Sequence, residues 1–159
     1  MGFPPIFASN EEASRAYMAC GMAVLNWGPI ELDLEGFLII LRNMTKQDTD
    51  TFPREFLRKL DEIKRLLRTD ARFSGIADDL RPVLGRSKEL HTIRTDVVHS
   101  ICQGTNLEGF LIFGKSNQRK GIAYSETRHS ILEIEAAAQE MRLLRERLEK
   151  PFQSLRALR

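Results

Sequence analysis

Apolar residues recur at helical spacing along most of this chain of 159 residues. The longest such series lies near the C-terminus and comprises Ile134, Ala137, Met141, Leu144, Leu148, Phe152 and Leu155. Steps of three and four residues place side chains on one face of an α-helix, and such a face is buried against another element. Ser130 and Glu133 have the spacing of a capping box. The pattern therefore predicts one long helix from about Ser130 almost to the C-terminus, with Pro151 tolerated as a late kink.

A long helix is also predicted near the N-terminus. Ser9 or Asn10 can cap its start, and two acidic residues follow in the first turn. The helical pattern continues to about Arg42. Proline cannot donate a hydrogen bond to the carbonyl four residues back, so a kink or a restart is expected at Gly28-Pro29.

Two more helices are predicted between these. Pro53 suits the first turn of the second helix, whose apolar stripe comprises Phe56, Leu60, Ile63 and Leu67. The third begins near Phe73 and ends near Ile101, just before Gly104, and Pro82 bends its early turns. Its apolar positions are Ile76, Leu80, Leu84, Ile93, Val97 and Ile101.

The segment from Leu107 to Glu126 has the composition of strands. The runs LEGFLIF and GIAYSE flank the polar run KSNQRK, a pattern typical of a β-hairpin. The sequence therefore predicts one all-α domain over residues 1–159. Its architecture is an antiparallel bundle of four or five helices with a short β-hairpin before the last helix.

Composition narrows the class of protein further. The net charge is only +2, but residues 1–52 carry −4 and residues 53–100 carry +3, a mild basic bias that also suits solvated helix faces. The two cysteines have neither CxxC nor zinc spacing, which favours a reducing compartment. The N-terminus lacks the pattern of a signal peptide, and the longest apolar run is far shorter than a membrane span. A cytoplasmic protein without membrane contact is expected.

The stretch RTDVVHS holds Arg94 and His99 where the third helix ends. Five residues turn a helix by about 500°, so the two side chains leave the axis roughly 140° apart. Their heads can still converge, because arginine is long and the helix ends here. Thr95 and Asp96 each share a helix face with His99. A simpler interpretation is that His99 stabilises the helix dipole and Asp96 forms a local ion pair or cap.

An arginine, four residues and then a histidine near the end of a helix resemble the signature of the HEPN superfamily. Trp27 and Glu31 on the first long helix are similar to the W-x-x-x-E of uncharacterised bacterial HEPN-like proteins. The resemblance covers about residues 10 to 156. Thr95 stands where many HEPN ribonucleases carry Asn, Asp or His, and Ile101 stands where some toxin members carry Tyr.

The resemblance implies a metal-independent endoribonuclease without cofactors, acting as a toxin or a phage-defence component. His99 would act as general base or acid, and Arg94 would hold the scissile phosphate, with Thr95, Asp96 and Glu31 in support. Family members pair across a dimer interface, so a homodimer is expected, with RNA as substrate and an antitoxin-like protein as a further partner. Two alternatives stay open: a catalytically silent HEPN-like module that binds RNA, nucleotide or a protein partner, and a structural helical domain with an accidental motif.

Other polar and aromatic residues give weaker signals. His91 and His129 are expected at the surface or in caps. Trp27 is expected in the core, and Glu31 is expected to be half-buried, where it could pair with Arg94. Three aromatic residues of the hairpin could stack on bases: Phe110, Phe113 and Tyr124. Hairpin aromatics, however, usually pack on the bundle. The basic tip that could contact RNA comprises Lys115, Arg119 and Lys120.

Overall fold

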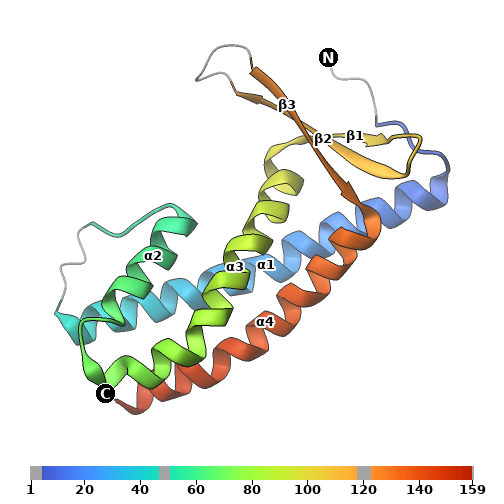
Figure 1. The fold of residues 1–159 in the computed structure, drawn as a ribbon. Helices are drawn as coiled ribbons and strands as arrows, with labels where there is room; N and C mark the ends of the chain where they lie inside the picture. Colours follow the sequence, from blue (N-terminus) through green and yellow to red (C-terminus); the bar gives the residue numbers. More distant parts are fainter. Residues whose placement is uncertain (1–4, 47–50, 118–122, 159) are drawn as a thin grey trace. The chain divides into compact units, whose positions relative to one another are not determined.

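Four α-helices and a small antiparallel sheet make up a computed structural model that describes residues 5–46, 51–117 and 123–158 (Figure 1). The helices are α1 (Asn10–Thr45), α2 (Phe56–Leu66), α3 (Ser74–His99) and α4 (Ile131–Ala157), and a short 3-10 helix (Ala71–Phe73) precedes α3. The strands are β1 (Ile101–Thr105), β2 (Phe110–Asn117) and β3 (Ala123–Ser130), in the spatial order β1-β2-β3. The protein is mostly helical, as predicted, but the prediction of an all-α bundle with only a two-stranded hairpin is corrected by the third strand.

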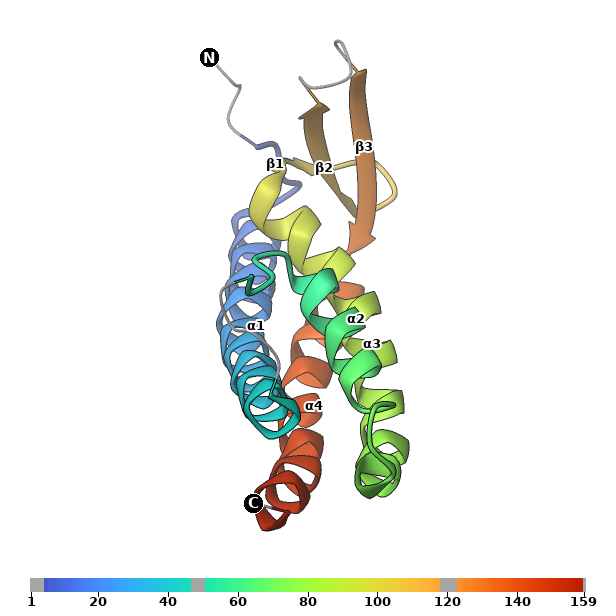
Figure 2. The same cartoon turned by 90° about the vertical axis from the view of Figure 1, so that its left-hand side faces the viewer.

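The additional strand follows α3 directly. The third helix was expected to reach Ile101, but it ends at His99, and Ile101 begins β1 (Figure 2). There it pairs with Gly114, and Cys102 pairs with Phe113. Ile101 follows Val97 by four positions, a spacing that fits both the 3.6-residue repeat of a helix and the two-residue repeat of a strand. It therefore extends the helical stripe of the sequence although it lies in a strand.

Helix α1 runs through Pro29 without a restart. Trp27 and Ile30, which flank the proline, are only 1% and 0% exposed. Burying these two side chains stabilises the helix by more than the single hydrogen bond that Pro29 removes. Pro151 likewise lies inside α4, as predicted. None of the described helices has a stretch long and apolar enough to cross a membrane.

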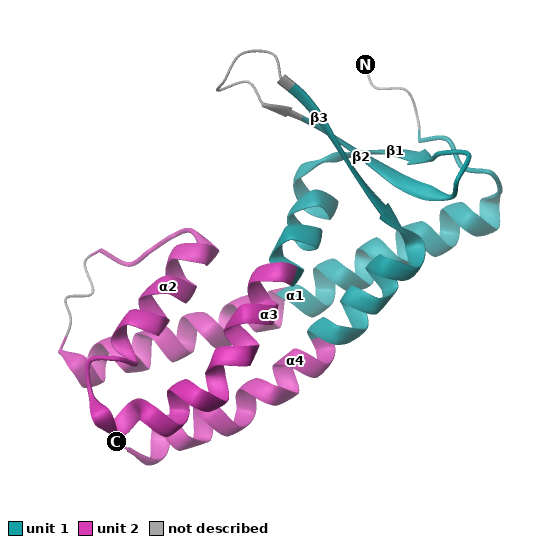
Figure 3. Ribbon diagram, in the orientation of Figure 1, with its two compact units in different colours: residues 1–27, 90–141 teal, residues 28–89, 142–159 magenta. Residues whose placement is uncertain are grey.

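The chain forms two compact units (Figure 3). Unit 1 contains residues 1–27 and 90–141, and unit 2 contains residues 28–89 and 142–159. The chain passes from one unit to the other inside α1, α3 and α4. Unit 1 carries the whole sheet and the C-terminal turns of α3, so it also carries the motif of interest.

The predicted capping box at the start of α4 is confirmed. The Ser130 N–H donates to a Glu133 carboxylate oxygen at 2.6 Å, and the Glu133 N–H donates to the Ser130 hydroxyl at 3.1 Å. The backbone hydrogen bond from Ser130 holds the pKa of Glu133 below its usual value. This cap fixes the junction of β3 and α4, and the residue immediately before it is His129.

A glycine anchors the N-terminal segment on the sheet. Gly104 has φ of +101°, a conformation that L side chains rarely adopt, and a Cβ there would overlap the backbone of Ile6. The Ile6 N–H donates to the Gln103 carbonyl at 3.0 Å, and the Thr105 N–H donates to the Ile6 carbonyl at 2.8 Å. The segment before α1 is thereby held against β1.

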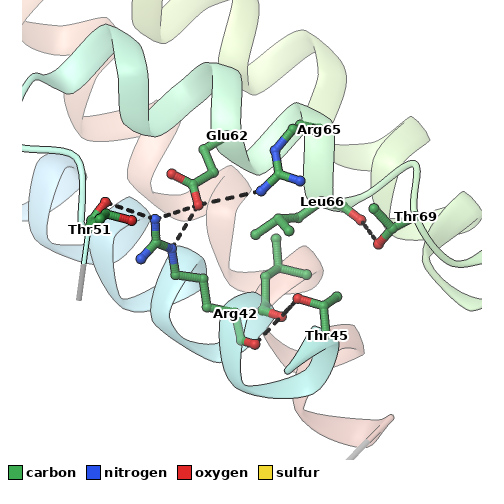
Figure 4. A network of polar contacts seen from close by, with 8 residues as sticks. Arg42, Thr45, Thr51, Glu62, Arg65, Leu66 and Thr69 are labelled. Atoms are coloured by element: carbon green, nitrogen blue, oxygen red, sulfur yellow. Dashed lines mark hydrogen bonds and ion pairs between the residues drawn. The ribbon is translucent and has the colours of Figure 1, made fainter. Parts of the chain in front are cut away.

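Unit 2 contains a buried polar network (Figure 4). The Arg42 guanidinium near the end of α1 donates to the Glu62 carboxylate on α2 at 2.7 Å and to the Thr51 carbonyl at 3.2 Å. Phe52 lies beneath the same guanidinium, 5.1 Å from its central carbon to the ring centroid. Arg42 therefore joins the end of α1, the segment before α2 and α2 itself.

Candidate functional site

The two motif residues meet at the end of α3. Arg94 Nη1 lies 3.2 Å from His99 Nε2. A guanidinium only donates hydrogen bonds, so His99 accepts on Nε2 and carries its proton on Nδ1. Arg94 is half-buried and His99 is exposed. The pair thus offers a fixed cation and an accessible imidazole at the protein surface.

Thr95, which shares a helix face with His99, is engaged elsewhere. Its hydroxyl lies 3.4 Å from His91 Nε2, one turn earlier in α3. The His91 ring is tilted against Trp27, with 5.5 Å between the ring centroids. Trp27 is buried, as predicted, and His91 is half-buried rather than a surface or capping residue, because it packs on this indole.

Asp96 pairs with His129, a partner that sequence reasoning missed. His129 Nε2 donates to the Asp96 carboxylate at 2.9 Å, and the two side chains are 16% and 12% exposed. His129 was expected at the surface or in a cap. Its place in β3 instead puts it on the same face as the buried Leu111 and Phe113, because His129 lies opposite Leu111 in the register. The alternation of side chains along the strand was the one feature of the sequence that indicated this position of His129.

The remaining predicted residues are scattered. Glu31 belongs to unit 2, so its predicted support of Arg94 stays a prediction. Lys115 is exposed on β2, whereas Arg119 and Lys120 lie outside the described residues. The hairpin aromatics differ in solvent exposure: Phe113 is buried, Phe110 is half-buried, and Tyr124 is 56% exposed.

Apolar side chains surround the exposed histidine. Val98 is 39% exposed and Ile101 is 69% exposed, while Val97 is half-buried. The Ser100 hydroxyl, which follows His99 directly, is buried and has no hydrogen-bond partner within the described part of the chain. The histidine is therefore framed by groups that a second molecule could cover.

The cysteines are free thiols in unit 1. Burial, and then the neighbouring Cys102, raise the pKa of Cys20 to about 11. Cys20 is therefore a neutral thiol at physiological pH and an unsuitable nucleophile. Among the described residues, no three His, Cys, Asp or Glu side chains gather in a way that would hold a metal ion.

No family model, curated protein or solved structure matches this chain. The functional interpretation consequently rests on the geometry of the Arg94–His99 pair and its surroundings.

Proposed function

We propose that this protein is a metal-independent endoribonuclease of the HEPN type that acts in the cytoplasm as a toxin or defence component. The observation that carries the proposal is the 3.2 Å contact between Arg94 and the exposed His99. Imidazole changes its charge between pH 5 and 8, and a guanidinium suits a phosphate because it stays charged and donates several hydrogen bonds. The pair supplies both kinds of group that RNA transesterification needs.

In the proposed reaction, His99 takes the proton of a ribose 2′-hydroxyl as the 2′-oxygen attacks the adjacent phosphorus. Arg94 turns from His99 to the phosphate and offsets the charge that develops on its oxygens. The bond from phosphorus to the 5′-oxygen breaks, and that oxygen leaves with a proton from a second acid. The products are a 2′,3′-cyclic phosphate and a 5′-hydroxyl end. His99 of a second protomer is the acid that the family resemblance implies.

The test is an RNA cleavage assay in excess EDTA. We expect cleavage to persist, to leave cyclic phosphate ends and to fail on a substrate with 2′-deoxyribose at the scissile position. His99→Ala should slow the reaction by roughly 100-fold or more, the usual contribution of acid–base catalysis. Cleavage that requires a divalent cation, or that proceeds at the same rate in His99→Ala, would show that the proposal is wrong.

We also propose a homodimer, formed through the end of α3. Val98 is 39% exposed beside His99, and covering it with a second copy would bring two motifs together. Light scattering should therefore give twice the mass of one chain. Val98→Asp should shift the mass to that of one chain and lower RNA cleavage in parallel. A wild-type protein that remains monomeric at high micromolar concentration would contradict the dimer.

One observation favours a second candidate function, a catalytically silent HEPN-like module that binds RNA, nucleotide or an antitoxin-like protein. Arg94 occupies the Nε2 lone pair that a base would use, and Thr95 is engaged with His91 rather than with His99. A protein with this second function would cleave no RNA in the EDTA assay. It would still bind RNA, nucleotide or a co-purified partner protein in a separate binding measurement.

A further inference from the structure

We propose that the ring of Tyr124 is a stacking platform for a base of single-stranded RNA on the solvent face of the sheet. The inference rests on the proposed function for its class of ligand and deepens it by naming where the strand is held. Every residue involved belongs to unit 1.

The register separates the two faces of the sheet. Ile101, Gly114 and Glu126 lie opposite one another across β1, β2 and β3, so they share a face. Side chains alternate along a strand, so Tyr124 and Arg128 lie on this face with Glu126. Cys102, Phe113 and Thr127 form the next row and point the other way, where Phe113 is buried. The face with Tyr124 is therefore the solvent face.

Three neighbours fix the Tyr124 side chain across the sheet. The Gln103 side-chain amide donates to the Tyr124 hydroxyl, which donates in turn to a Glu126 carboxylate oxygen at 3.1 Å. Gly114 lies beneath the phenol, and a Cβ at this position would overlap the Tyr124 hydroxyl. The ring is thus oriented before any ligand arrives and yet is 56% exposed. A preoriented ring loses little conformational entropy when a base stacks on it.

The surroundings of Tyr124 favour a nucleic acid over a protein. The exposed Ile101 shares this face, but Gln103, Glu126 and Arg128 on it are polar or charged and exposed, so the ring is not part of a broad apolar patch. Among the described residues, Arg128 has no ion-pair partner and is available to a phosphate. An exposed aromatic ring that shares a sheet face with a cation is typical of surfaces that bind single strands with little sequence preference.

The platform is continuous with the Arg94–His99 pair. His99 is only two residues before Ile101, and Ile101 lies opposite Gly114, which the Tyr124 phenol covers. Two residues span at most about 7 Å and neighbouring strands are about 4.8 Å apart, so the Gly114 backbone beneath the ring lies within roughly 12 Å of the His99 backbone. A few nucleotides span such a distance. A base on Tyr124 would therefore hold a neighbouring phosphodiester near the pair.

The chain offers a matched control. It contains two tyrosines, and Tyr17 on α1 is 58% exposed, almost the same fraction as Tyr124. Tyr17 contacts Phe7 edge to face, and the exposed Met18 follows it, so its surroundings are apolar. Tyr124→Leu removes an aromatic ring from a polar setting, and Tyr17→Leu removes the same ring from an apolar setting.

The experiment measures fluorescence anisotropy of a labelled hexauridine with 2′-O-methyl groups, which cannot be cleaved. Tyr124→Leu should weaken binding by about 5- to 100-fold, the range for one lost stacking contact. Tyr124→Phe, which keeps the ring, and Tyr17→Leu should bind within about threefold of wild type. Binding that is equal in wild type and Tyr124→Leu, equal weakening by both leucine variants, or no binding by the wild type would overturn the inference. A change of light-scattering mass in Tyr124→Leu with unchanged oligonucleotide binding would overturn it too, since it would assign the ring to a protein interface.

A second measurement does not depend on the folding of any variant. A hexamer with 5-iodouridine should crosslink to the wild-type peptide that contains Tyr124, and crosslinks confined to other peptides would overturn the inference. Neither measurement involves cleavage. A protein that binds through Tyr124 but cleaves no RNA would therefore refute the proposed catalysis alone, and one that cleaves RNA while Tyr124→Leu binds normally would refute this inference alone.

Discussion

Arg94→Ala should lose at least about 100-fold of its RNA cleavage rate and keep the melting temperature of the wild type. Removing one donor that stabilises a developing oxyanion typically costs this much. The fold should not suffer, because among the described residues the hydrogen bond of this half-buried side chain goes to the exposed His99. Single-turnover rates and calorimetry on the same samples measure both effects.

Asp96→Ala is the internal control for this prediction, only two positions along α3. Asp96 is buried and accepts from His129 at 2.9 Å, so its loss leaves the half-buried His129 donor without this partner. We expect a decrease of about 1–3 kcal/mol in the free energy of unfolding. If Arg94→Ala lowers the melting temperature as much as Asp96→Ala does, then Arg94 has a structural role and the catalytic interpretation is wrong.

Glu62→Ala should cause the largest loss of stability, about 3–5 kcal/mol, because it removes the carboxylate that pairs with the buried Arg42 guanidinium. Arg42 is only 3% exposed, and its Nη2 lies 2.6 Å from the Glu62 carboxylate. The guanidinium also donates to the Thr51 carbonyl, which is uncharged. Urea unfolding followed by circular dichroism measures the change.

Two further variants serve as controls for Glu62→Ala. The double variant Arg42→Met, Glu62→Leu should be more stable than Glu62→Ala alone, because it removes both charges of the pair and fills their space. Asp78→Ala breaks the ion pair of Asp78 with Arg81, whose side chains are 71% and 77% exposed, and should cost less than about 1 kcal/mol. Equal effects of Asp78→Ala and Glu62→Ala would show that burial does not determine the strength of these pairs.

Local signals in the sequence were sufficient for most of the helices. The stripe of α4 and its capping box at Ser130 and Glu133 correctly predicted where that helix starts and that it passes Pro151. Of the kink or restart expected at Pro29, the restart was wrong, because a local rule about proline cannot weigh the burial of Trp27 and Ile30 on either side. Strand β1 was missed because its five residues pair with segments distant in the sequence and carry no periodicity of their own.

In the candidate site, too, contacts between residues close in the sequence were predictable and contacts between distant residues were not. The meeting of Arg94 and His99 depends on five consecutive positions at a helix end, and the reach of arginine made it predictable. The pairing of Asp96 with His129 joins residues 33 positions apart and follows from the β2–β3 register, which no local pattern encodes. The placement of Tyr124 over Gly114 likewise depends on which residues face each other across the hairpin.

The passage of the chain between its two units constrains how this protein can be shortened. Each unit combines segments that are distant in the sequence, and every passage lies inside a continuous helix. No contiguous fragment contains unit 1 without part of unit 2, since residues 1–27 and 90–141 are both needed for unit 1. A fragment that begins after α2 would carry Arg94, His99 and the whole sheet but lack the alanine-rich first half of α1, including the buried Ala16, Ala19 and Ala23. A minimal version of the site would therefore require residues 27 and 90 to be joined by a designed linker.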